Sequence, residues 1–312
     1  MTVRHGPDGC TVVAGYQPVM GTHLHLQITA PTEAACRAAE AAALDEAVRL
    51  QALFTVFDAD SPLCRWRRGD DDAVPREVTS LLEVAAGWQV RTGGAFNVQT
   101  AVLTDRWLRS EVEGREPSAD ELAALAGSIA EPPYEVVAGV VHRRGDCRAV
   151  DLNAVAKGHV ADLVARRLRS ERGVARVVVN AGGDLVHRGA GSVVVGVDDP
   201  HGGDGAPPLH RIEVADAAVA TSGRARRWFE VGGVRRSRVL DPRTGLPADR
   251  IASATVVADD AAAAEVLATA ATVLGPHPIL DETPTFLVGT DGTEQRSDAW
   301  HDLVVAARAV PA

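Results

Sequence analysis

The chain is poor in aromatic residues and has no patterned cysteines. Only 4% of its 312 residues are Phe, Trp or Tyr, so its hydrophobic content rests mainly on Ala and Val. Its four cysteines, Cys10, Cys36, Cys64 and Cys147, form no C-x-x-C pair. That spacing argues against both a cysteine zinc site and a disulfide framework. Scattered cysteines of this kind suit a reducing compartment.

Long apolar runs are also missing. No run of about 18 apolar residues exists, which is the length that a membrane-spanning helix needs. The first ten residues, M-T-V-R-H-G-P-D-G-C, lack the apolar core of a signal peptide. We therefore expect a protein without a membrane span, located in the cytoplasm.

Positive charge is scarce relative to negative charge. The net charge of −10 argues against nucleic acid or an anionic membrane as the main partner. Two basic clusters occur, at residues 224–227 and 235–238, but they are short and interrupted. We predict that they are solvent-exposed surface.

Several catalytic and nucleotide-binding motifs are absent. The sequence has no G-x-G-x-x-G and no G-x-x-x-x-G-K-[ST], so it shows neither a Rossmann fingerprint nor a P-loop. It also has no G-x-S-x-G nucleophile elbow and no H-E-x-x-H zinc motif.

Strands and helices are predicted in an intermixed order. Alternation predicts a strand over 22–28, and helices are predicted from the Thr32 cap to Phe54, over 77–91, over 120–126 with Ser118 as its cap, within 150–168 and over 261–274. Two short strands within 135–150 should turn at residues 144–146, and a hairpin around Gly232-Gly233 should pair 228–231 with 237–240. No linker or repeat divides the chain. The pattern predicts one α+β domain over residues 1–312.

The most informative stretch runs from Val150 to Leu185. Asp151 and Lys157 flank small residues at the start of a predicted helix, and the following strand ends in Asn-Ala-Gly-Gly-Asp at 180–184. Small residues and a helix start offer backbone N–H groups to an anion, so this stretch is a candidate phosphate-binding segment. A plain salt bridge between Asp151 and Lys157 and a simple turn at 180–184 are the alternatives.

A second candidate site lies on the last predicted helix. Glu265 and Thr269 are four residues apart and therefore share one face of it. A carboxylate and a hydroxyl beside main-chain carbonyls form the oxygen-only set that Mg²⁺ takes. Ordinary surface positions on an Ala-rich helix are the alternative. The Thr221-Ser222-Gly223 segment is too short to decide anything alone.

Taken in order, these segments resemble the ApbE family of FAD:protein FMN transferases over about residues 20–275. The segments that carry the resemblance are Met20-Gly21-Thr22, Phe57 to Ser61, Gly94-Ala95-Phe96-Asn97 with Trp107, Asp151 to Gly158, Asn180 to Asp184, Ala220 to Gly223, Asp241-Pro242-Arg243-Thr244-Gly245 and Ala264 to Ala270.

The resemblance implies a single α+β, T-fold-like domain with mixed or antiparallel sheets and packed helices. It implies cleavage of FAD, transfer of the FMN phosphoryl group to a Thr or Ser hydroxyl in an S/T-G-A-S/T-like motif of a target protein, and release of AMP. The flavin nucleotide would bind at Met20, Phe57, Ala95, Phe96, Asn97, Asp151, Lys157, Gly182, Gly183, Thr221, Ser222 and Val239. Magnesium would bind at Ala154, Glu265, Ala268 and Thr269, and the catalytic residues would be Lys157, Arg238, Asp241 and Glu265.

Three residues depart from the family pattern. Arg238 stands where the family usually has His, Glu265 where it has a metal-binding Asp, and Asn97 where it has Asp. Arginine stays protonated and cannot act as a base, although it can bind phosphate. Two alternatives to transfer therefore remain: a FAD-binding protein acting as a carrier, redox protein or complex subunit, and a Mg²⁺-dependent FAD hydrolase.

Overall fold

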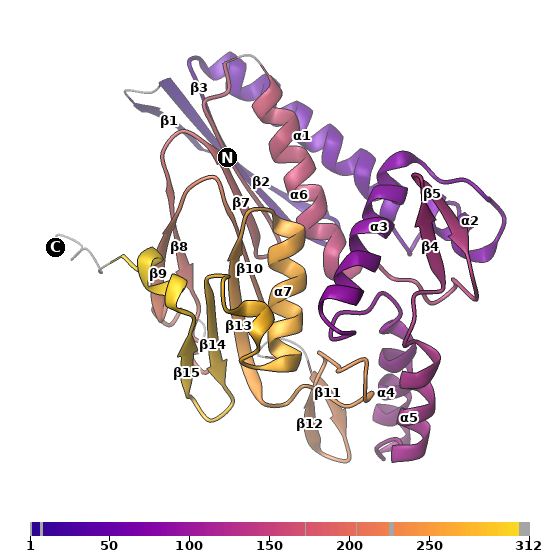
Figure 1. The fold of residues 1–312 in the computed structure, drawn as a ribbon. Helices are drawn as coiled ribbons and strands as arrows, with labels where there is room; N and C mark the ends of the chain where they lie inside the picture. Colours follow the sequence, from indigo (N-terminus) through magenta and orange to yellow (C-terminus); the bar gives the residue numbers. More distant parts are fainter. Residues whose placement is uncertain (1, 7–8, 172, 204, 225–227, 306–312) are drawn as a thin grey trace.

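The computed structural model describes residues 2–6, 9–171, 173–203, 205–224 and 228–305, and within them nine strands form one sheet (Figure 1). Its order is β1-β2-β3-β6-β7-β10-β13-β14-β15, and every neighbouring pair is antiparallel. The strands are β1 Thr2–Gly6, β2 Gly9–Val19, β3 Thr22–Ala30, β6 Arg176–Ala181, β7 Asp184–Gly189, β10 Ala218–Gly223, β13 Ile251–Ala258, β14 Thr285–Gly289 and β15 Glu294–Arg296.

Three helices cover one face of the sheet: α1 (Glu33–Phe54), α6 (Asn153–Ser170) and α7 (Ala261–Leu274) (Figure 1). The Thr32 hydroxyl caps α1 by accepting from Ala35 N at 3.2 Å, and the Asp260 carboxylate caps α7 by accepting from Ala263 N at 2.8 Å. Alanine and glycine at the α6–α7 contact allow the two helix backbones to approach closely. The main hydrophobic core lies between these helices and the sheet.

A smaller core covers part of the opposite face. Strands β8 (Val193–Val197) and β9 (His210–Val214) and the 3₁₀ turn Asp298–Leu303 pack there, with Trp300 stacked on Phe286 at 5.3 Å between ring centroids. Strand β13 is therefore buried on both faces, which explains why its sequence is continuously apolar or small rather than alternating.

Four further helices and two hairpins lie to the right of α6 and below α7 (Figure 1). They are α2 (Pro62–Arg68), α3 (Arg76–Arg91), α4 (Ala101–Glu113), α5 (Ala119–Ser128), the hairpin β4 (Tyr134–Val137) and β5 (Val140–Arg143), and the hairpin β11 (Trp228–Val231) and β12 (Val234–Ser237). Trp107 of α4 stacks on Phe229 of β11, so the second hairpin is anchored to that helix.

The predicted α+β fold is confirmed, as are the strand over 22–28 and the five predicted helices. One turn and one strand boundary were predicted wrongly. The first short hairpin turns at Ala138-Gly139, both with positive φ, rather than at 144–146; an alanine at φ 50° leaves no signal in the sequence. The second hairpin turns at Gly232 and Gly233 as predicted, but the turn has only these two residues, so β12 spans Val234–Ser237 instead of 237–240.

Two further expectations concern surfaces. Arg235 is exposed, and Arg236 is partly exposed and paired with Glu116, while residues 225–227 of the other basic cluster lie outside the described residues. In the part of the chain that the structure describes, no helix combines the length and apolarity needed to cross a membrane.

Candidate functional site

A cavity of about 380 Å³ opens where four segments meet. They are the loop leading into α4 and its first turns, the start of α6, the segment after β12, and one residue of α7. The lining residues are Ala95, Phe96, Asn97, Thr100, Ala101, Thr104, Asp105, Asp151, Asn153, Ala154, Arg238, Val239, Leu240, Pro242 and Thr269. Eight of the residues predicted from the sequence are among them: Ala95, Phe96, Asn97, Asp151, Ala154, Arg238, Val239 and Thr269.

Asp151 fixes the start of α6 against the loop that precedes α4. Its backbone N–H donates to the Val98 carbonyl at 2.7 Å, while its carboxylate accepts from the Asn153 backbone N–H at 2.9 Å and side-chain amide at 3.1 Å. The salt bridge between Asp151 and Lys157, one alternative for this stretch, is therefore not what the structure shows. Asp151 acts on the backbone at the helix start.

Asp241 and Trp107 hold the opposite wall of the cavity. The Asp241 carboxylate accepts two hydrogen bonds from the Arg243 guanidinium, both at 2.8 Å, and one from the Arg243 backbone N–H at 3.0 Å. The Trp107 indole N–H donates to the Gly245 carbonyl at 2.9 Å. These contacts stabilise the Asp-Pro-Arg-Thr-Gly turn. Pro242 lines the cavity, whereas the Asp241 carboxylate is engaged in hydrogen bonds within the turn.

Arg238 places a permanent positive charge on the cavity wall. Its guanidinium lies 4.8 Å from the Phe229 ring centroid, and its nearest carboxylate, Glu111, is 3.9 Å away. Its Nε is buried and has no hydrogen-bond partner among the described residues. A guanidinium with unused donors beside a cavity is suited to binding an anionic oxygen.

Lys157, Glu265 and Asp184 form a charged cluster one helical turn behind the cavity wall. Lys157 follows the cavity-lining Asn153 by four residues on α6, and Glu265 precedes the cavity-lining Thr269 by four residues on α7. The Lys157 ammonium donates to Glu265 Oε1 and to the Asn153 carbonyl at 3.2 Å, and lies 3.4 Å from Asp184 Oδ2.

The two carboxyl groups of this cluster are far less exposed than the lysine. Their side chains are each 7% exposed, against 30% for Lys157. Burial opposes the lysine charge, but the charges of Glu265 and Asp184 outweigh it, so the pKa of Lys157 is raised. Burial, and then the charge of Glu265, raise the pKa of Asp184 to about 7 against the opposing effect of Lys157. The lysine therefore stays protonated at neutral pH.

The donors around this cluster suit Mg²⁺. Among the described residues no group of three or more His, Cys, Asp or Glu could hold a metal ion, and the charged cluster contributes two carboxylates, those of Glu265 and Asp184. The Thr269 hydroxyl and the carbonyls of Ala154 and Ala268 are further oxygen donors nearby, although the Ala268 carbonyl already accepts from Thr272 Oγ1 at 2.9 Å. Magnesium commonly takes one or two carboxylates and completes its shell with water and substrate phosphate.

Ten of the predicted residues are outside the cavity lining that the described chain forms: Met20, Phe57, Lys157, Gly182, Gly183, Thr221, Ser222, Asp241, Glu265 and Ala268. Thr221 lies on the inner strand β10, where its side chain is exposed on the face of the sheet and its hydroxyl pairs with that of Thr255 at 2.9 Å. Gly182 lies against Thr22, and a Cβ there would come within 2.5 Å of the Thr22 hydroxyl. Met20 packs against the main core, and its backbone N–H donates to the Gln51 side chain.

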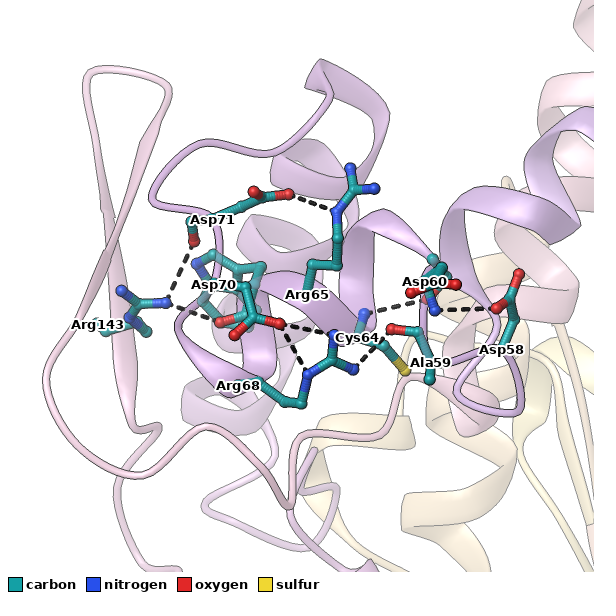
Figure 2. A network of polar contacts seen from close by, with 11 residues as sticks. Asp58, Ala59, Asp60, Cys64, Arg65, Arg68, Asp70, Asp71 and Arg143 are labelled. Atoms are coloured by element: carbon teal, nitrogen blue, oxygen red, sulfur yellow. Dashed lines mark hydrogen bonds and ion pairs between the residues drawn. The ribbon is translucent and has the colours of Figure 1, made fainter.

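Phe57 is 90% exposed and begins a loop that a polar network fixes in place (Figure 2). Arg68 donates to the Ala59 carbonyl at 2.6 Å and to the Asp70 carboxylate at 2.8 Å, while Arg65 pairs with Asp71 at 2.7 Å. The loop is thus tied to α2 and presents its aromatic side chain to solvent.

Sequence reasoning missed seven residues of the cavity wall and one of the charged cluster. The missed wall residues are Thr100, Ala101, Thr104, Asp105, Asn153, Leu240 and Pro242. The pairs Thr100–Thr104 and Ala101–Asp105 have i, i+4 spacing, so a helix assigned to 101–113 would have indicated this face. Asp184 ends the Asn-Ala-Gly-Gly-Asp motif, but the sequence holds no signal that it meets Lys157.

Comparison with known proteins gives consistent matches. A protein from Treponema pallidum named FAD:protein FMN transferase is 32% identical over 222 residues, which cover 65% of this chain and 61% of that protein. One of the same name from Klebsiella pneumoniae is 29% identical over 279 residues, 83% of this chain and 77% of its own length. The crystal structure of the ApbE protein from Thermotoga maritima superposes with a TM-score of 0.82 at 26% identity, covering 95% of this chain and 100% of that one.

The family assignment rests on a match along most of the chain. The sequence model of the ApbE family matches residues 20–283, a span that includes every lining residue of the cavity and the whole charged cluster. The chain therefore belongs to the ApbE family.

Proposed function

We propose that this protein is a Mg²⁺-dependent FAD:protein FMN transferase that moves the FMN phosphoryl group of FAD to a Thr or Ser hydroxyl of a target protein. The observation that carries the proposal is the cavity with Arg238 on its wall and the Lys157–Glu265–Asp184 cluster one helical turn behind it. The curated relatives named FAD:protein FMN transferase support it.

In this proposal FAD occupies the cavity, in contact with Ala95, Phe96, Asn97, Asp151 and Val239. Arg238 binds a phosphate oxygen through its unused donors. Glu265, Thr269 and the carbonyls of Ala154 and Ala268 are the metal-binding candidates. Bound Mg²⁺ supplies neutralisation of the charge that develops on the pyrophosphate oxygens. The roles of Met20, Phe57, Gly182, Gly183, Thr221, Ser222 and Asp241 remain proposals for residues outside the cavity lining.

The reaction exchanges one P–O bond for another. The acceptor hydroxyl oxygen bonds to the FMN phosphorus, the bridging P–O bond of the pyrophosphate breaks, and AMP leaves with that electron pair. Lys157 supplies a positive charge beside the site, because Glu265 and Asp184 keep it protonated. The hydroxyl proton passes to a base, which Arg238 cannot be.

Arg238 also favours a second candidate function. The cavity-lining carboxylates are Asp105 and Asp151, and the latter is already engaged with the Asn153 amides. If neither takes the proton of a protein hydroxyl, water becomes the acceptor and the protein is a Mg²⁺-dependent FAD hydrolase, or it holds FAD without chemistry.

One experiment separates these functions. The protein is incubated with FAD, Mg²⁺ and an acceptor carrying an S/T-G-A-S/T motif, and flavin fluorescence is read on a denaturing gel. The matched control is the same acceptor with Ala in place of the hydroxyl residue. A fluorescent band that the control lacks supports transfer; AMP and free FMN without a band indicate hydrolysis. Recovery of intact, tightly bound FAD contradicts both enzymatic functions.

Glu265→Ala tests the metal site within the same assay. We expect it to abolish the Mg²⁺ dependence of any activity, because it removes one of the two carboxylates available there. Unchanged metal dependence would place the Mg²⁺ elsewhere.

We also propose that residues 1–312 act as one domain in the cytoplasm. The four cysteines, all within the described residues, are free and buried, and free thiols are typical of reducing compartments. Exclusive recovery of the natural protein from the cytoplasmic fraction of its host would agree with this.

A further inference from the structure

The Glu265 carboxylate already has a partner on each oxygen. Oε2 accepts from the Gly158 backbone N–H at 2.9 Å, and Oε1 accepts from the Lys157 ammonium. The backbone N–H of a helix cannot move away, so Oε1 is the oxygen that a metal ion would use. A divalent cation there would lie beside the lysine ammonium, and two like charges at that separation repel strongly.

Asp184 is an alternative ion-pair partner for the Lys157 ammonium. Its Oδ2 is buried and has no hydrogen bond within the described chain, which is rare for a carboxylate oxygen. It lies 3.4 Å from the Lys157 ammonium. A shift of about 0.6 Å would bring the two atoms to about 2.8 Å, the length of a charge-assisted hydrogen bond.

The turn between β6 and β7 fixes Asp184 in this position. Gly182 and Gly183 both have positive φ, and the Gly183 N–H donates to the Asn180 side chain at 2.9 Å. Asp184 is then the first residue of β7, paired with Ala181 across the ladder. None of these residues lines the cavity. The Asn-Ala-Gly-Gly-Asp motif therefore contributes to the charged cluster, by positioning Asp184, rather than to the cavity wall.

We propose that the Lys157 ammonium occupies the position of the divalent cation beside Glu265 in the metal-free protein. Asp184 is then the positioning residue that binds this ammonium when the cation binds Glu265. The exchange keeps the ammonium inside the site, one turn from Asn153, so the metal and the lysine charge act there together. This inference rests on the metal site of the proposed function.

The test measures Mn²⁺ binding by electron paramagnetic resonance, without FAD or acceptor, in a double-mutant cycle of Lys157→Met and Asp184→Asn. We expect Lys157→Met to tighten Mn²⁺ binding by about tenfold, because the competing charge is gone. Asp184→Asn should weaken it by about tenfold in the natural background, a typical loss for a residue that acts behind the metal ligands. In the Lys157→Met background the same substitution should cost less than about threefold.

Two controls keep the result interpretable. Asp146→Asn removes an exposed carboxylate that pairs with Arg148, and it should leave Mn²⁺ affinity unchanged. Asp184→Glu retains a carboxylate for the lysine and should restore most of the affinity lost in Asp184→Asn. If Asp184→Asn fails to fold, Lys157→Met and Asp184→Glu still decide the question.

Three outcomes overturn the inference: Lys157→Met that binds Mn²⁺ no more tightly, Asp184→Asn that costs the same in both backgrounds, or Mn²⁺ binding to none of the variants. The second outcome would make Asp184 a direct metal ligand. The Mn²⁺ assay contains no FAD, so its result is independent of flavin transfer. If the Mn²⁺ affinities follow the expected double-mutant cycle but no flavin is transferred, the inference holds and the proposed transferase function is contradicted. If flavin is transferred but the Mn²⁺ affinities do not follow that cycle, the transferase function holds and the inference is contradicted.

Discussion

A methyl group added at Gly158 should strongly destabilise the fold. It lies on α6 where that helix crosses the first turn of α7, and an added Cβ would meet the Ala261 carbonyl oxygen at 2.3 Å, its carbon at 2.6 Å and the Ala262 nitrogen at 2.9 Å. All three are main-chain atoms, so no side chain can rotate away. Ordinary contact begins near 3.4 Å, so the helices must separate by 3.4 − 2.3, or about 1 Å.

The contacts around Gly158 resist that separation. The Ala261 N–H donates to Asp162 Oδ2 at 2.5 Å, and the Gly158 N–H donates to Glu265 Oε2 at 2.9 Å. Overpacking of this kind costs about 3 kcal/mol or more, whereas replacing a helical glycine with alanine gains about 1 kcal/mol. We therefore expect Gly158→Ala to lower the free energy of unfolding by about 2 kcal/mol or more.

Gly87→Ala is the matched control. Gly87 lies on the exposed face of α3, and its added Cβ would meet no heavy atom of the described residues within 4 Å. This substitution should stabilise the protein by about 0.5–1 kcal/mol. Urea unfolding followed by circular dichroism measures both variants. If Gly158→Ala is as stable as Gly87→Ala, the close approach of the α6 and α7 backbones is wrong.

Two further predictions concern His159 and Trp107. Burial lowers the pKa of His159 to about 4; the charge of Asp260 opposes this shift and the smaller effect of Arg166 adds to it. As the pH falls from 6.5 towards 4, the unfolded chain therefore binds the proton before the folded protein does, and about 2 kcal/mol of stability is lost after allowance for partial exposure. His159→Gln should remove this part of the decrease between pH 7 and pH 5; identical decreases in urea midpoint would refute it. Trp107→Phe leaves the Gly245 carbonyl without its hydrogen-bond donor, so it should lower the free energy of unfolding by about 1–3 kcal/mol and weaken FAD binding. Trp228, which is 38% exposed, provides the control: Trp228→Phe should change neither stability nor FAD binding.

Much of the local structure could be predicted from the sequence because its causes are local. Thr32 and Ser118 were expected as helix caps, and both hydroxyls accept from the backbone N–H three residues on. Alternation over 22–28 indicated the buried face of β3, where Leu24, Leu26 and Ile28 are buried. Sheet order was out of reach, because β3 pairs with β6, a strand about 150 residues away whose sequence does not specify its partner.

The candidate site divides in the same way. Ala95, Phe96 and Asn97 were found as one segment, and the structure keeps them together on the cavity wall. The Lys157–Glu265 contact joins residues 108 positions apart. Only the packing of α6 on α7 creates it, so neither helix sequence reveals it alone.

The sequence posed a choice between an anion-binding Lys157 and a salt bridge to Asp151, and the spacing of the two residues did not settle it. Asp151 precedes α6, which begins at Asn153, so the helix does not fix the direction of its side chain relative to Lys157. In the structure the two side chains have separate roles, since Asp151 orders the backbone at the start of α6 and Lys157 faces two buried carboxyl groups. Because Asp151 leaves the lysine unneutralised, the lysine charge depends on Glu265 and Asp184 alone. In the exchange proposed above, a cation that binds Glu265 therefore changes the position of Lys157.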